Sequence, residues 1–216
     1  MLKTKDIPRE LKNFNSLFFD FQYKYDLYML FDDLLTIIIC CLARKTEEKL
    51  YFETIAKYTK EEINTLAKLM AELFIIYGRA QKNEDWADPL GDFYEALASG
   101  SKKSVFGQFF TPRSLCTIMA SLVLDTEEWG KTINEPYSGS GRLILASNHI
   151  SKGNYYVAQD LDPLCCKMTA INMCMHEIRG EVHNMDVLRQ TTPRISYSIN
   201  FNFHKHKTLI IQLKRP

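Results

Sequence analysis

The chain has 216 residues, of which 46% are apolar and 25% charged, and its formal net charge at pH 7 is +1. This composition is typical of an ordinary globular protein with a full hydrophobic core, arranged as one large domain or two small ones. The near-neutral charge excludes a globally basic nucleic-acid binder, although it allows local basic patches.

The first part of the chain is expected to be helical from about residue 14 to residue 80. The apolar run Leu34–Ala43 is about half a membrane span, so it predicts a buried helix. A capping box at Thr59–Glu62 opens a helix that Gly78 is expected to end. Pro89 starts a further short helix, PLGDFYEALA. We therefore predict a helical N-terminal region, residues 1–88, in front of a second region, residues 89–216.

Cysteine usage and the N-terminus predict a cytoplasmic protein. The six cysteines include two adjacent pairs and no Cys-x-x-Cys, so we expect reduced thiols without disulfides. Ligand spacing for zinc is missing, and no metal site is predicted. The first ten residues hold no apolar segment of a signal peptide, and no membrane association is expected.

From about residue 114 the pattern alternates between helices and short strands, which predicts an α/β domain. Such a succession favours a parallel, doubly wound sheet with right-handed crossovers, as in Rossmann-like folds. The expected helices are Ser114–Leu124, with Thr111 as N-cap, then Leu143–Ile150, and a long one from Asp162 to about Ile178. The expected strands are Thr132–Glu135, Tyr155–Gln159 and Glu181–Met185.

The segment INEPYSGSGRLILAS, residues 133–147, carries the strongest functional signal. An acid, Glu135, ends a strand, and the turn Ser138–Gly141 leads directly into a helix. This is the strand–turn–helix unit with which doubly wound sheets hold nucleotide-like cofactors. Because the acid favours a ligand with a cationic end, S-adenosylmethionine fits better than a dinucleotide. A dinucleotide would also require a third glycine, where the chain has Ile144.

Three aspartates follow the turn in the sequence, at positions where a cofactor-binding acid is expected. Asp160 lies 21 residues after Gly139, close to the spacing at which a second-strand acid meets ribose hydroxyls. Leu161 would present an apolar surface to a purine. Asp162 is read either as a ligand or, with Pro163, as a helix N-cap. Asp186 is read either as an acceptor for an adenine amino group or as a turn aspartate.

Together with an upstream loop, Phe106–Pro112 (FGQFFTP), these segments resemble a known family. Gly-Gln-Phe-Phe-Thr-Pro, Glu-Pro-Tyr-Ser-Gly-Ser-Gly, Gln-Asp-Leu-Asp-Pro and Asn-Met-Asp-Val-Leu occur in this order between about residues 88 and 190. They are similar to segments of the N6-adenine DNA methyltransferases, above all the modification subunit of type I restriction–modification systems. The resemblance implies an S-adenosyl-L-methionine cofactor and DNA as a partner.

The resemblance also implies a set of cofactor-binding residues. Glu135 would face the amino group of the methionine part and Asp186 the adenine, whereas Arg142 departs from the small residue usual at its position. The N-terminal helices could contact a protein partner. The implied cofactor-binding residues are Gln108, Phe109, Phe110, Thr111, Pro112, Arg113, Glu135, Pro136, Ser138, Gly139, Ser140, Asp160, Leu161 and Asp186.

The catalytic motif that the resemblance implies is missing. The family positions the target amine with Asn/Asp-Pro-Pro-aromatic after a fourth strand, and no such tetrapeptide occurs in this sequence. Two further strands, Ile195–Phe203 and Thr208–Gln212, are expected in the tail, followed by Leu213 where the tetrapeptide would begin. We therefore predict no catalytic residue, and expect a truncated relative or a fragment. The alternative is an inactive cofactor-binding module for assembly or regulation.

Overall fold

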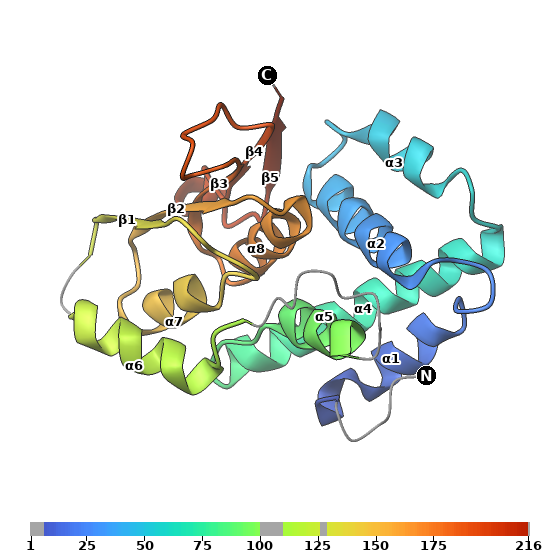
Figure 1. Ribbon diagram of the computed structural model, residues 1–216, viewed down its shortest axis with the longest axis horizontal. Helices are drawn as coiled ribbons and strands as arrows, with labels where there is room; N and C mark the ends of the chain where they lie inside the picture. The colour runs from blue at the N-terminus through green and yellow to red at the C-terminus, as the bar shows by residue number, and fades with distance from the viewer. Residues whose placement is uncertain (1–6, 100–109, 126–128, 216) are drawn as a thin grey trace.

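The computed structural model describes residues 7–99, 110–125 and 129–215, which form a helical half and a sheet half (Figure 1). The described residues before the sheet half are mainly helical, as the sequence predicts. The helical half consists of the short 3₁₀-helix η1 (Arg9–Leu11) and the helices α1 (Lys12–Phe19), α2 (Leu27–Leu42), α3 (Glu48–Ile55), α4 (Lys60–Lys82) and α5 (Pro89–Ser99).

Local caps explain where two of these helices begin. The Asp26 side chain accepts hydrogen bonds from the first turn of α2. At α4 the predicted capping box is present, because Thr59 and Glu62 each bond to the other's backbone. The expected stop at Gly78 is wrong, since α4 continues to Lys82. Gly78 keeps a helical φ there, and a helix interior tolerates glycine at a modest cost in stability.

An aromatic cluster joins α5 to the helices before it. The ring of Phe93 lies 4.7 Å from Phe14 and 4.8 Å from Phe18 between centroids, both edge-on. Its centroid is 5.8 Å from that of Phe31 in α2. All four rings are fully buried. Thus α5, which we placed at the start of the second region, also completes the core of the first.

The sheet half largely follows the predicted order of elements. Several boundaries differ from the predicted ones. The expected strands Glu181–Met185 and Thr208–Gln212 are found at Arg179–Asn184 and Ile211–Lys214, and the helix expected to reach Ile178 ends at Met175. Pro112, rather than Thr111, is the residue before α6, and the strand expected over Ile195–Phe203 ends at Ile199, where Asn200 takes a positive φ of 51°. The elements are α6 (Arg113–Val123), β1 (Thr132–Glu135), α7 (Arg142–Ile150), β2 (Tyr155–Asp160), α8 (Pro163–Met175), β3 (Arg179–Asn184), β4 (Ile195–Ile199), α9 (Phe203–His206) and β5 (Ile211–Lys214).

The sheet is mixed, which corrects the prediction of a parallel sheet. Strands β1, β2 and β3 are parallel, but β4 pairs antiparallel with β3, and β5 antiparallel with β4. The spatial order is β1-β2-β3-β4-β5, so each strand lies next to the one that precedes it in the sequence. Because successive right-handed crossovers then fall on one side, α7 and α8 share a face, and the predicted doubly wound arrangement is not formed.

The two faces of the sheet differ in polarity. Tyr156, Ala158 and Val182 are buried on the helical face. On the other face Glu181 accepts a hydrogen bond from the Tyr155 hydroxyl at 2.9 Å and lies 3.2 Å from the His183 ring. This period-two alternation is typical of a sheet with one apolar and one polar face.

Cysteine and metal expectations can be compared with the described residues. All six cysteines are free thiols. Within the described part of the chain, no group of His, Cys, Asp and Glu side chains is arranged to hold a metal ion. No helix in the same ranges is both long and apolar enough to cross a membrane.

Candidate functional site

The Gly-Ser-Gly turn lies at the carboxyl ends of β1 and β2. Gly139 and Gly141 have φ angles of +55° and +91°, which glycine adopts without strain. A Cβ on Gly139 would stand 2.8 Å from the Phe110 ring. The turn is closed by the Gly141 amide, which donates to the Ser138 carbonyl at 2.7 Å, and Gly141 is the cap of α7. Glycine is therefore required at position 139 both by conformation and by space.

Two side chains from neighbouring elements hold this turn. Asp160, at the end of β2, accepts a hydrogen bond from the Gly139 amide at 2.9 Å, and its other oxygen accepts from the Asp162 amide at 2.9 Å. Thr169 of α8 donates to the Gly139 carbonyl at 2.9 Å. The 21-residue spacing thus brings Asp160 against the turn, where it orders the backbone.

A buried guanidinium connects the turn to helix α5. Arg142 is the first residue of α7, and only 8% of its side chain is exposed. Its Nε donates to Asp88 at 2.7 Å, and its Nη2 donates to Asp92 at 2.7 Å and to Glu95 at 2.8 Å. We call these four side chains the Arg142 cluster. Asp88 directly precedes α5, and the 88, 92, 95 spacing places the three acids on one helical face.

Asp88 is saturated with donors. One carboxylate oxygen accepts from the Ser140 hydroxyl at 2.5 Å as well as from Arg142, and the other accepts from the Gly91 amide and from Asn172. Asn172 also donates to the Ser140 carbonyl at 2.7 Å. Burial raises the pKa of Asp88, whereas Arg142 and the hydrogen-bond donors oppose this rise by favouring the ionised carboxylate.

The Arg142 cluster also reaches the Phe-Phe-Thr-Pro loop. Glu95 binds Arg142 with one oxygen and accepts the Phe110 amide with the other at 2.8 Å. The Phe110 ring lies 5.4 Å from the guanidinium carbon. One arginine therefore positions both the Gly-Ser-Gly turn and Phe110, close before α6.

The electrostatics of the Arg142 cluster are unbalanced. Burial lowers the pKa of Arg142, but its three acidic neighbours raise it by more than burial lowers it. The pKa is therefore above its ordinary value, and the guanidinium stays charged. Burial and the charge of Asp88 raise the pKa of Asp92 to about 7, although Arg142 opposes the shift. With all groups ionised, three carboxylates face one guanidinium, and the surroundings of the turn are acidic.

A cavity of about 220 Å³ lies beside the turn. Burial raises the pKa of Glu135 and of Asp160, and the charge of Asp160 raises that of Glu135 further. A cation in the cavity would favour their ionised forms. Seven residues from the predicted cofactor set line this cavity: Phe110, Thr111, Glu135, Ser138, Gly139, Ser140 and Asp160.

Other predicted residues do not line this cavity. Asp162 is the N-cap of α8, its side chain accepting from the Leu164 amide at 2.8 Å. Asp186 accepts from the Arg189 amide in a turn after β3 and does not line the cavity. Arg113 pairs with Asp85. Leu161, Pro112 and Pro136 do not line the cavity either, and Gln108 and Phe109 lie outside the described residues.

Sequence reasoning missed most of the supporting residues. Nothing in the turn motif points to Asn172 or Thr169, which come from the middle of α8. A signal did exist for Asp88, Asp92 and Glu95, because three acids share one face of an otherwise apolar helix. Such a face predicts a basic partner, which is Arg142.

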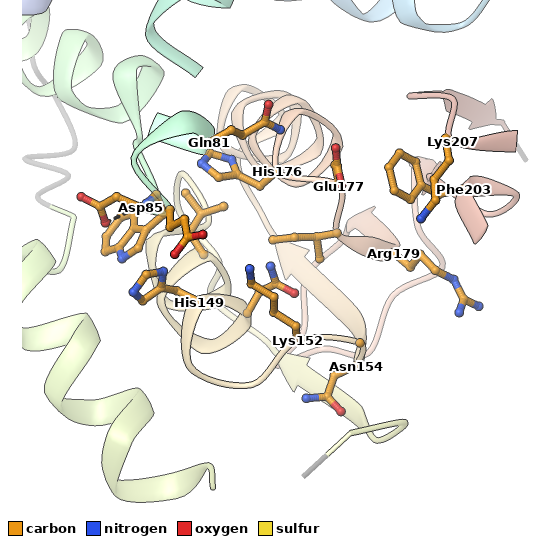
Figure 2. Close-up of a pocket in the computed structure, with 16 residues that line it drawn as sticks. Gln81, Asp85, His149, Lys152, Asn154, His176, Glu177, Arg179, Phe203 and Lys207 are labelled. Carbon is orange, nitrogen blue, oxygen red and sulfur yellow. Dashed lines mark hydrogen bonds between the residues drawn. The ribbon is translucent and has the colours of Figure 1, made fainter. Parts of the chain in front are cut away.

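A larger cavity, of about 440 Å³, lies at the opposite ends of the strands. It is bordered by Asn154 and Ile178, which directly precede β2 and β3. Figure 2 shows Gln81 and His176 on one side of it and Lys152 on another. Its charges are mixed, and His176 uses both ring nitrogens within the protein. We assign the site to the smaller cavity because ligands of α/β sheets bind at the carboxyl ends of strands.

Comparison with known proteins identifies the family. The family model described as N-6 DNA Methylase matches residues 85–202, more than half of the chain. The chain belongs to the N-6 DNA methylase family. The matched segment begins just before Asp88 and thus includes the whole Arg142 cluster.

A solved structure is also similar to this family member. It is the crystal structure of the type I restriction-modification system methyltransferase subunit from Streptococcus thermophilus, with 23% sequence identity and a TM-score of 0.44. The match covers 87% of this chain and 42% of that chain. The chain therefore spans less than half the length of that subunit.

The Arg142 cluster predicts the effect of removing its only cation. Arg142→Met leaves three carboxylates without their partner and should lower the free energy of unfolding by about 3–5 kcal/mol. Arg113→Met breaks a half-exposed ion pair and should cost about 0–1 kcal/mol. Denaturant unfolding of both variants checks the difference. Equal losses would show that the buried cluster adds nothing beyond a surface ion pair.

The raised pKa of Asp92 predicts a pH dependence. A carboxyl with a pKa of about 4 in the unfolded chain and about 7 in the folded chain binds more protons when folded between these values. The stability from this group is therefore full below pH 4 and lost as the pH rises through 7. Asp92→Asn should show a flatter fall of unfolding free energy over this window, and an unchanged slope would contradict the assignment.

Proposed function

We propose that this chain binds S-adenosyl-L-methionine and forms the methyl-donor side of an N6-adenine DNA methyltransferase. The observation that carries the proposal is the 220 Å³ cavity, in which the Gly-Ser-Gly turn, Glu135 and Asp160 meet. Membership in the N-6 DNA methylase family supports a methyl donor as the ligand. We place the protein in the cytoplasm, with DNA as its partner.

The residues of the cavity fit this cofactor chemically. Glu135 and Asp160 supply negative charge for the ammonium and sulfonium groups, and the acidic Arg142 cluster lies behind them. A Cβ on Gly139 would collide with the Phe110 ring, which also lines the cavity, so glycine here keeps the turn and that ring in place. The cavity is smaller than the roughly 300–1,000 Å³ of typical ligand sites, so it accounts for part of the cofactor. Leu161 directly follows Asp160 and is 57% exposed, so it offers an apolar surface beside this cavity-lining acid.

What the chain contributes to the reaction is binding and orientation. When bound, S-adenosyl-L-methionine supplies an electrophilic methyl group. The turn and the Phe110 loop would hold that donor in one place, which lowers the entropic cost of bringing it to an amine. The receiving residues, Asn/Asp-Pro-Pro-aromatic, do not occur in the sequence. We therefore propose donor binding without methyl transfer by this chain alone.

The missing tetrapeptide also favours the second candidate, an inactive cofactor-binding module with an assembly or regulatory role. A protein partner would then contact the N-terminal helices, where Tyr23, Met29 and Phe52 are exposed. Both candidates require cofactor binding. They differ in whether a complementing polypeptide restores methyl transfer.

Calorimetric titration with S-adenosyl-L-methionine tests the cofactor proposal. The wild-type chain should bind, and Gly139→Ala should weaken binding about tenfold or more, because Cβ meets Phe110 at a strained φ. Gly78→Ala is the matched control, since a Cβ there meets nothing within 4 Å. It should bind like the wild type.

A tritiated-methyl transfer assay on mixed-sequence DNA completes the test. Binding without transfer is the expected result. No binding at millimolar cofactor would overturn the proposal, and methylated adenine would show that the chain catalyses transfer without the tetrapeptide.

A further inference from the structure

A buried tyrosine of helix α4 belongs to the hydrogen-bond network around the Gly-Ser-Gly turn. Tyr77 is 1% exposed, and its hydroxyl donates to Asn172 Oδ1 of α8 at 2.6 Å. Burial and the charge of Asp88 raise the pKa of Tyr77 well above its ordinary value, so the hydroxyl keeps its proton and remains a donor. A helix of the N-terminal region therefore donates a hydrogen bond into the interior of the sheet half.

The side-chain amide of Asn172 connects this contact to the turn. Asn172 is fully buried, and its Nδ2 donates to Asp88 Oδ1 and to the Ser140 carbonyl, each at 2.7 Å. The reverse orientation of the amide would place Oδ1 against these two acceptors. The Tyr77 hydroxyl donates to Oδ1 and thus favours the orientation in which Asn172 binds the turn.

Ser140 is the residue of the turn that receives this network. Its carbonyl accepts from Asn172, its hydroxyl donates to Asp88 at 2.5 Å, and only 1% of the residue is exposed. The flanking residues, Gly139 and Gly141, restrict the backbone little by themselves, because glycine adopts many conformations. Contacts from outside the turn therefore determine where Ser140 and the adjoining wall of the cavity stand.

A second contact joins the same two helices without reaching the turn. Gln81 lies one helical turn after Tyr77, and its Nε2 donates to the Met175 carbonyl at 2.7 Å. Met175 is the last residue of α8. The chain therefore offers two polar contacts between α4 and α8, of which one orients a ligand of the turn and the other only ties the helices together.

We propose that Tyr77 is a positioning residue for the cofactor turn. Its hydroxyl orients Asn172, and Asn172 holds Ser140 in the conformation that shapes the cavity wall. The inference rests on the proposed function, and it adds that the helical N-terminal region sets the affinity for S-adenosyl-L-methionine. A shift of α4 against α8 changes the turn although α4 makes no contact with the ligand.

Amide hydrogen exchange of the full chain without cofactor tests the positioning. Tyr77→Phe removes one hydroxyl and keeps the ring, so exchange at the Gly139 and Gly141 amides should accelerate about fivefold or more. Tyr58→Phe is the matched control, because Tyr58 is also buried and its hydroxyl donates to Asp33 at 2.5 Å within the helical half. It should leave both turn amides unchanged, although denaturant unfolding should show a similar loss of stability in the two variants.

A second control separates the turn from the packing of the two helices. Gln81→Met removes the other contact between α4 and α8 and keeps the length of the side chain, so it should also leave the turn amides unchanged. Equal acceleration in Tyr77→Phe and in either control would show that general stability or helix packing governs the turn, and the proposal would be overturned.

Calorimetric titration with S-adenosyl-L-methionine tests the consequence for binding. Tyr77→Phe should raise the dissociation constant about fivefold or more, and both controls should match the wild type. A wild-type chain that binds no cofactor would overturn the proposed function, while the exchange comparison would still decide whether Tyr77 positions the turn. In a chain that binds, equal dissociation constants for the wild type and Tyr77→Phe would overturn the inference itself.

Discussion

The Arg142 guanidinium, enclosed by three carboxylates, is the interaction on which the rest of the site depends. A buried cation is stable only when its partners are close and fully hydrogen-bonded, and Asp88, Asp92 and Glu95 meet this condition. Through Asp88 the cluster fixes Ser140 of the turn, and through Glu95 it fixes the Phe110 amide. Two segments separated by more than twenty residues are thus positioned by one side chain.

The sheet explains why the cavity needs this support. In doubly wound folds the crevice opens where the strand order reverses, and strands on both sides wall it. Among the described residues β1 is the edge strand, so within this part of the chain no second strand walls the cavity beside it. The Phe110–Thr111 segment lines the cavity, and Glu95 of α5 anchors that segment. The acidic surroundings that result favour a cationic ligand such as the one we propose.

Much of this arrangement is predictable from sequence, because it follows from local patterns. Apolar periodicity and caps located the helices, and the Glu135 to Gly141 segment predicted the turn, with β1 matching its expected bounds. The direction of β4 and β5 was not predictable, since an alternating strand fits a parallel or an antiparallel neighbour equally well. The Arg142 cluster was missed because its members come from two helices that only the tertiary fold brings together. Asp162 was predicted to be either a ligand or a helix N-cap. In the structure it is the N-cap of α8, as the proline at the next position had already suggested.

Amide hydrogen exchange on Arg142→Met measures the central claim most directly. The Gly139 amide bonds to Asp160, and the Phe110 amide bonds to Glu95, so each reports on one segment that the cluster positions. If Arg142 positions both, exchange should accelerate at both amides in Arg142→Met and at neither in Arg113→Met. Faster exchange at only one of them, or the same change in both variants, would contradict a single residue holding the two segments together.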